Sequence, residues 1–206
     1  MELILPILLF AVSAGITPGP NNIMLMASGL NYGVKKSIPH LLGVVFGFPV
    51  MTILIGLGFE IVFQKFPVLH EIIKIVGILY LIYLAWRIAT SSKQSAGGAK
   101  ATPLRFWQAV LFQWVNPKAW IMATGAIAAY TSLSSDFFTQ VLIIALTFML
   151  VAFPCAGSWL VFGSSLKRYL QKPAYQQAFN VTMALLLIAS IMPVVIELIS
   201  HAIGQI

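Results

Sequence analysis

The chain has 206 residues, of which 60% are hydrophobic and only 8% are charged. A soluble domain carries roughly 25% charged residues, so this composition excludes an ordinary globular protein and indicates an outer surface that faces lipid. The formal net charge is +7, but the basic residues lie between apolar stretches and no nucleic-acid-binding motif is present, which argues against a nucleic-acid partner. The single cysteine, Cys155, excludes an internal disulfide, a CxxC redox pair and a thiolate metal cluster.

Six apolar stretches predict six transmembrane helices, each close to the roughly 20 residues that cross the hydrocarbon core. Backbone polar groups in lipid must be satisfied within their own segment, so we expect an all-α integral membrane protein. No basic residue precedes the first stretch, so we expect it to be a retained helix and not a signal peptide. The predicted helices cover residues 3–29, 38–60, 70–90, 104–130, 137–166 and 175–200.

The first predicted helix is interrupted near its middle by two prolines, a glycine and three polar residues. An interior proline removes a helical hydrogen bond and costs about 3 kcal/mol or more, so the helix should unwind there. The freed backbone groups need partners at membrane depth, and half-helix ends in a cavity can bind the carboxylate or ammonium of a zwitterion. We predict that this stretch lines a substrate path; a structural kink without a ligand is the alternative. The stretch consists of Thr17, Pro18, Gly19, Pro20, Asn21 and Asn22.

The fourth predicted helix has a matching interruption, with Gln113, Asn116, Pro117 and Lys118 inside an apolar run. Lys118 is the most informative residue, because a lysine near the bilayer centre costs at least about 2.5–3.5 kcal/mol and is usually functional. Three roles stay open for its ammonium group: it binds a substrate carboxylate, it exchanges a proton, or it caps carbonyl groups that Pro117 frees. No acidic residue lies deep in a predicted helix, so we expect no divalent-metal site, and no motif indicates a cofactor.

Basic residues concentrate in the loops that follow the first, third and fifth predicted helices. The positive-inside rule places these loops in the cytoplasm and therefore both termini outside it. The Ser/Gly-rich loop 91–103 is expected to be a flexible linker between a first repeat, 1–90, and a second repeat, 104–206. Because each half has an odd number of helices, the second half enters the membrane from the side opposite to the first. We therefore predict a 3+3 inverted-topology repeat within one transporter domain, 1–206. The basic loop residues are Lys35, Lys36, Arg87, Lys93, Lys100, Arg105, Lys167, Arg168 and Lys172.

Three motifs carry a family resemblance that extends over nearly the whole chain. They are Thr17-Pro18-Gly19-Pro20-Asn21-Asn22, Ala27-Ser28-Gly29-Leu30-Asn31-Tyr32-Gly33 and Asn116-Pro117-Lys118. They resemble the LysE/RhtB family of bacterial amino-acid exporters, and the stretch from Tyr80 to Ser91, followed by Phe106-Trp107, is most similar to the cysteine/O-acetylserine exporter branch. Many family members have an acidic residue after a glycine in the second helix, whereas Phe48 follows Gly47 here, which favours a neutral substrate over a cationic one.

The resemblance implies a secondary transporter in the bacterial inner membrane that uses the proton gradient to export small amino acids or their derivatives from the cytoplasm. Its expected partners are the amino acid, protons and the lipid bilayer, and the motifs of the first and fourth helices would line the translocation path. A small channel, or an exporter of an unrelated solute, is the alternative. The single cysteine disfavours a six-span redox protein, and the lack of an HExxH, paired-aspartate or serine–base motif disfavours an enzyme. Small-xxx-small spacings such as Gly29-xxx-Gly33 predict close helix packing and leave a homo-oligomer open.

Overall fold

The computed structural model is helical throughout the part of the chain that it describes, which comprises residues 4–59, 65, 67–94, 102–131, 137–170 and 172–204. Those residues form helices and short connections and include no strand, so the all-helical prediction is confirmed for them. The elements are α1 (Ile4–Ile16), α2 (Pro20–Tyr32), α3 (Val34–Leu54), the π-helical turn η1 (Ile55–Phe59), α5 (Pro67–Gln94), α6 (Phe106–Phe112), the 3-10 turn η2 (Gln113–Val115), α7 (Pro117–Tyr130), α8 (Phe137–Leu166) and α9 (Pro173–Gly204).

Each predicted helix has a helical counterpart, and the fifth coincides with α8. The first and fourth are not continuous: they are broken at the predicted interruptions, into α1 plus α2 and into α6, η2 and α7. The first also ends later than expected, at Tyr32. The predicted linker is too long, because α5 continues to Gln94, and residues 95–101 of that linker lie outside the described part of the chain.

Several of these helices are long and apolar enough to cross a membrane. By length and composition they are Val34–Gly58, Phe137–Leu166 and Pro173–Ser200, and α1 with α2 makes a fourth span if the bent pair is counted as one. Within α5 the apolar part, Ile75–Ser91, is shorter. The count of six spans, the inverted repeat and the position of the termini therefore remain predictions.

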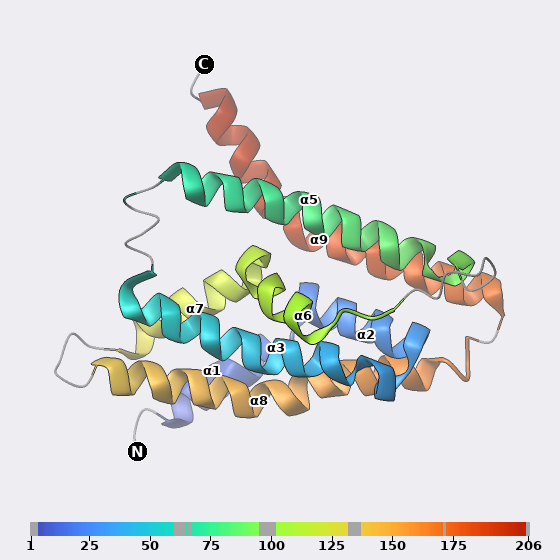
Figure 1. Cartoon of the computed structure of the whole chain (residues 1–206), viewed down its shortest axis with the longest axis horizontal. Helices are drawn as coiled ribbons and strands as arrows, with labels where there is room; N and C mark the ends of the chain where they lie inside the picture. Colours follow the sequence, from blue (N-terminus) through green and yellow to red (C-terminus); the bar gives the residue numbers. More distant parts are fainter. Residues whose placement is uncertain are drawn as a thin grey trace.

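The helices are arranged around two pairs of long neighbours (Figure 1). One pair is α3 and α8, with α1 and α2 packed on α8 and with α6 packed on α3. The other pair is α5 and α9, which run side by side along one edge of the molecule. Contacts of α2 with α5, α8 and α9 join the two pairs, so α2 is the most enclosed of the short helices.

Among the described residues, three buried apolar clusters hold this arrangement together, and the smallest, between α2, α3, α6 and α8, comprises Leu25, Val44, Ala109, Ala156 and Leu160. Of the other two, the first lies between α2, α5 and α9 and includes Met24, Leu81, Leu84, Met183 and Leu187. The second lies between α1, α3, α7 and α8 and includes Ile7, Ala11, Phe48, Ala123 and Phe148. Large apolar side chains also cover the outside, where Leu9, Leu150 and Leu185 are 62%, 68% and 64% exposed. An outer surface of this kind fits a protein whose solvent is lipid and not water.

Glycines let α2 and α8 meet backbone to backbone. A Cβ atom at Gly29 would overlap the carbonyl oxygen of Leu160 and lie 2.8 Å from the amide nitrogen of Ser164. From the opposite side, a Cβ atom at Gly163 would overlap the carbonyl oxygen of Met26. Each neighbour is backbone and cannot rotate away, so only glycine fits at both positions. The sequence singled out Gly29 but gave no reason to pair it with Gly163.

We predict that the substitutions Gly29→Ala and Gly163→Ala each force α2 away from α8. Overpacking of a close contact costs about 1–3 kcal/mol, so both variants should unfold at a lower temperature in detergent than the wild type. The control is Gly157→Ala, also in α8, where an added Cβ atom meets nothing within 4 Å. Equal unfolding temperatures for Gly29→Ala and Gly157→Ala would contradict the close contact.

Candidate functional site

The break between α1 and α2 deprives carbonyl groups of their helical donors, and side chains replace those donors. Pro18 has no N–H, so the carbonyl of Ala14 loses its partner, and the Thr17 hydroxyl donates to that carbonyl at 2.8 Å. Pro20 leaves the last carbonyl of α1 free in the same way, and the Trp159 indole of α8 donates to it at 3.1 Å. Because the freed carbonyls are hydrogen-bonded, the break is an ordered part of the structure and not a frayed helix end.

Asn22, a buried residue in the first turn of α2, bridges the break. Its amide nitrogen donates to the carbonyl of Gly15 at 2.8 Å and to the carbonyl of Thr17 at 2.9 Å. Both amide hydrogens are thus used on the end of α1, which lies at 53° to α2. A buried carbonyl without a donor costs about 1–3 kcal/mol, so this one side chain stabilises the bent form of the pair.

Lys118 brings the second break against the first. It lies in the first turn of α7, and its ammonium nitrogen donates to the carbonyl of Thr17 at 2.9 Å, to the hydroxyl of Thr17 at 2.7 Å and to the carbonyl of Pro18 at 3.3 Å. An ammonium group has three donors, so all of them are engaged. Gly19 leaves room for the stem of this side chain, because a Cβ atom there would lie 2.6 Å from the Lys118 Cδ.

Of the three roles predicted for Lys118, capping of free carbonyls is the one that the structure displays. The carbonyls that Lys118 caps differ from those considered for this role. They belong to the break in the first helix, about 100 residues earlier, and are not those freed by Pro117. The ammonium group is therefore the link between the two broken helices, and any anion that binds it has to compete with the carbonyls of Thr17 and Pro18.

The second break is built from amide side chains. The turn η2 follows α6, Asn116 is extended with φ −92° and ψ 108°, and Pro117 starts α7. The Asn116 side chain caps α7 by accepting from the amide nitrogen of Lys118 at 3.2 Å. Gln113 is completely buried, and it exchanges hydrogen bonds with Asn21 of α2 at 2.9 and 3.3 Å. The two breaks are thus joined twice, once by an ammonium group and once by a pair of amides.

A cavity of about 550 Å³ opens beside these two breaks, between α1, α3, α7 and α8. Five of the predicted site residues line it: Gly19, Asn21, Asn22, Asn116 and Lys118. The rest of the wall is apolar and partly small, with Ala11, Ala14, Gly15, Phe48, Ala119, Phe148 and Cys155 among its members. The cavity therefore offers one cation, three amides and small apolar surfaces, and its lining residues include no acid.

The other predicted residues hold the breaks in place and do not line the cavity. Thr17 and Pro18 accept the hydrogen bonds of Lys118. Gln113 positions Asn21. Pro20 and Pro117 start α2 and α7 at the first helical position, where a proline is favoured because its missing N–H has no helical partner.

A second polar cluster, which no sequence motif indicated, joins α2, α5 and α9. Asn31 and Asn180 exchange hydrogen bonds at 2.9 and 3.1 Å. Gln176 donates to Asn31 at 3.1 Å, and Asn180 also donates to the hydroxyl of Ser91 at 2.9 Å. These residues are up to 149 positions apart in the chain, so no local pattern could have paired them. The cluster fixes the end of α2 that is remote from the break.

Comparison with known proteins gives matches over most of the chain. A family model described as LysE type translocator matches residues 12–195. Proteins named cysteine/O-acetylserine efflux protein are similar to the chain over 180 residues, which are 87% of the chain and 90% of each relative. They come from Escherichia coli O139:H28 (27% identical), Escherichia coli K12 (26% identical) and Shigella flexneri (27% identical). No solved structure matches the chain.

Proposed function

Because the chain belongs to the LysE type translocator family, as its motifs predicted, we propose that it exports small neutral amino acids or their derivatives from the cytoplasm. Family membership makes it a transporter and not an enzyme. Cysteine and O-acetylserine, which appear in the names of the relatives, are the first substrates to test. One observation carries the proposal: Lys118 joins the two helix breaks at the wall of a cavity that is otherwise amide-lined and apolar.

The composition of the cavity wall supports a neutral amino acid. A substrate carboxylate needs a cation, and Lys118 supplies one within a surface of low polarity, where the attraction is strong. A second positive charge on a lysine-like substrate would face Lys118 without any acidic partner among the lining residues. Small wall residues such as Ala11, Ala14 and Gly15 leave space for the short side chain of the substrate.

A zwitterion suits this site because it offers a new partner both to the donor and to the acceptors of the hydrogen bonds that it breaks. Its carboxylate takes the ammonium group of Lys118, and its own ammonium takes the carbonyls of Thr17 and Pro18 that Lys118 releases. No buried polar group is left without a partner during the exchange, so the desolvation cost stays small. A substrate that loosens the link between the breaks frees α1 and α7 to move relative to α2, which is how a ligand shifts a two-state equilibrium.

We propose that the six helical regions form six spans in a 3+3 inverted repeat of one domain, 1–206, in which the linker predicted as 91–103, shortened at its start because α5 ends at Gln94, separates the two repeats. The contacts of α3 with α8 and of α5 with α9 support this arrangement, since these are the equivalent helices of the two halves. The basic loops support both termini outside the cytoplasm of a bacterial inner membrane. The proton gradient is the driving force that the family resemblance implies.

In this orientation α1 and α7 lie in the outer half of the membrane, and α2 and α6 lie in the cytoplasmic half. The cavity is lined by α1 and α7 and so would open toward the outside. The close contact of α2 with α8 at Gly29 and Gly163 would seal the cytoplasmic side. The conformation then corresponds to the stage of the cycle at which an exporter releases its substrate.

Reporter fusions to the two ends of the chain test this orientation. An alkaline phosphatase fused to either terminus should be active, because that enzyme works only outside the cytoplasm, and a cytoplasmic reporter at the same positions should be silent. A reporter in the loop after α8, beside Lys167, should give the opposite result. A C-terminus that reports from the cytoplasm would rule out the six-span count.

The substitution Lys118→Ala tests the transport site. In liposomes loaded with O-acetyl-L-serine, the wild type should take up labelled cysteine, O-acetylserine, threonine or leucine by counter-flow, but not lysine. Loss of a charged hydrogen-bond partner costs about 1.5–3 kcal/mol, so the variant should exchange at least about tenfold more slowly. Lys167→Ala, at an exposed cation outside the cavity, serves as the control and should exchange like the wild type. Full exchange by a correctly inserted Lys118→Ala protein would refute the carboxylate site, and exchange of lysine alone would refute the neutral substrate.

A further inference from the structure

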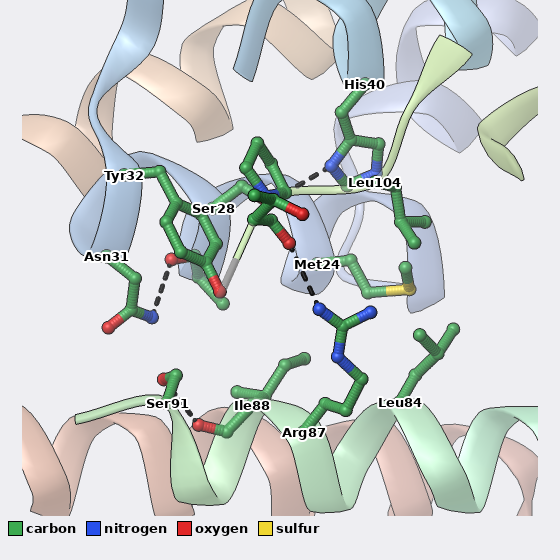
Figure 2. A pocket seen from close by; sticks show the side chains of 13 residues that line it. Met24, Ser28, Asn31, Tyr32, His40, Leu84, Arg87, Ile88, Ser91 and Leu104 are labelled. Carbon is green, nitrogen blue, oxygen red and sulfur yellow. Dashed lines mark hydrogen bonds between the residues drawn. The ribbon is translucent and has the colours of Figure 1, made fainter. Parts of the chain in front are cut away.

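A second pocket lies at the other end of α2, between α2, α3, α5 and the segment Thr102–Leu104 (Figure 2). Its empty space is about 400 Å³, counting the part that is open to solvent. The chain order and the basic loops put this end of α2 at the cytoplasmic side in the proposed orientation. The pocket shares no lining residue with the cavity at Lys118.

His40 lines this pocket and has a buried, unpaired ring nitrogen. The side chain is 1% exposed, and its Nδ1 forms a hydrogen bond of 3.0 Å with the hydroxyl of Ser28. Its Nε2 has no hydrogen-bond partner among the described residues. A buried polar atom without a partner costs about 1–3 kcal/mol, and such an atom in a native protein calls for an explanation. Because Nε2 is itself covered in this conformation, a polar ligand in the pocket supplies the missing partner once the side chains over it move aside.

Arg87 supplies the charge of the pocket. Figure 2 shows it rising from α5 toward the side of the pocket where Ser28 and His40 lie. The guanidinium donates to the carbonyl of Thr102 at 3.1 Å, which is the one hydrogen bond that the described part of the chain gives it. A guanidinium has five N–H donors in a planar fork that suits a carboxylate, so most of its capacity is free. No acidic residue is among the lining residues, so nothing in the wall neutralises this cation.

The remaining walls suit the rest of a small amino acid. The hydroxyl of Tyr32 lines the pocket and has no hydrogen-bond partner within the described part of the chain. Apolar contact is offered by Met24, Leu84 and Leu104. Asn31 is held in a fixed orientation by Asn180, so this wall of the pocket is preorganised. The imidazole Nε2 is a donor in one tautomer and an acceptor in the other. A zwitterion can pair with either tautomer, because its carboxylate accepts and its ammonium donates.

We propose that this pocket is a second, cytoplasmic binding site for the exported amino acid, in which Arg87 binds the α-carboxylate and Tyr32 and His40 bind the remaining polar atoms. The inference rests on the proposed transport function and deepens it. The substrate meets Arg87 first, when it enters from the cytoplasm, and meets Lys118 second. Residues of the same helix, α2, line both sites, and the two sites share no lining residue.

The substitution Arg87→Gln tests the site through the sidedness of its effect. Inside-out vesicles expose the cytoplasmic face, and right-side-out vesicles expose the outer face; the probe in both is labelled O-acetyl-L-serine. Loss of Arg87 should raise the half-saturating concentration at the cytoplasmic face about tenfold or more, and should leave the value at the outer face within about twofold. Tyr32→Phe, which removes only a hydroxyl group, should raise the cytoplasmic value about threefold. Arg168→Gln, at an exposed arginine outside the pocket, should change neither value.

Each other outcome has a defined meaning. If Arg87→Gln changes the half-saturating concentration equally at both faces, or leaves it unchanged at the cytoplasmic face, the second site is refuted. Transport by the wild type would still support the proposed function in that case. An effect of Arg87→Gln that is present in vesicles with phosphatidylglycerol and absent in vesicles of phosphatidylcholine alone would assign the pocket to a lipid phosphate and also overturn the site. If the wild type moves no amino acid in either type of vesicle, the proposed function itself falls, and this inference falls with it.

Discussion

The structure depends on a single constraint: the carbonyl groups at the break of the first helix must find donors at membrane depth. Two prolines create the need, because neither Pro18 nor Pro20 can donate to the preceding turn. The donors come from four side chains, namely Thr17, Asn22, Lys118 and Trp159. Two of these belong to helices that are distant in sequence, so satisfying one break fixes the position of α7 and α8 relative to α1. Local backbone chemistry thereby determines tertiary structure.

The same constraint explains why a lysine is acceptable inside an apolar helix. An isolated lysine at this depth would be costly, but the Lys118 ammonium is fully hydrogen-bonded to carbonyls that needed a donor. These hydrogen bonds stabilise the structure, and we propose that a zwitterion can replace them by binding both the ammonium group and the carbonyls. In the proposed transport cycle this one group couples binding to conformational change, and the cavity beside it has small apolar wall residues.

Much of this was visible in the sequence, because prolines, glycines and charges act locally. The helical content, the position of both breaks and the family followed from Pro18, Pro20 and Pro117 and from the few polar residues around them. The partners of those residues were not visible. Nothing near Ile16 indicates that Trp159 donates to it, and nothing near Gly29 indicates Gly163, since these pairs depend on how α8 crosses α1 and α2. For the same reason the carbonyls that Lys118 caps and the pairing of Asn31 with Asn180 were not predicted.

If the cavity beside the two breaks holds the substrate, the single cysteine of the chain should report substrate binding directly. Cys155 lines that cavity. Its rate of modification by a membrane-impermeant methanethiosulfonate reagent can be followed from the outer face of right-side-out vesicles. We expect modification from that face, slowed several-fold by saturating O-acetyl-L-serine in the wild type and not slowed in Lys118→Ala. A rate that O-acetyl-L-serine and every other neutral amino acid leave unchanged in the wild type would contradict it.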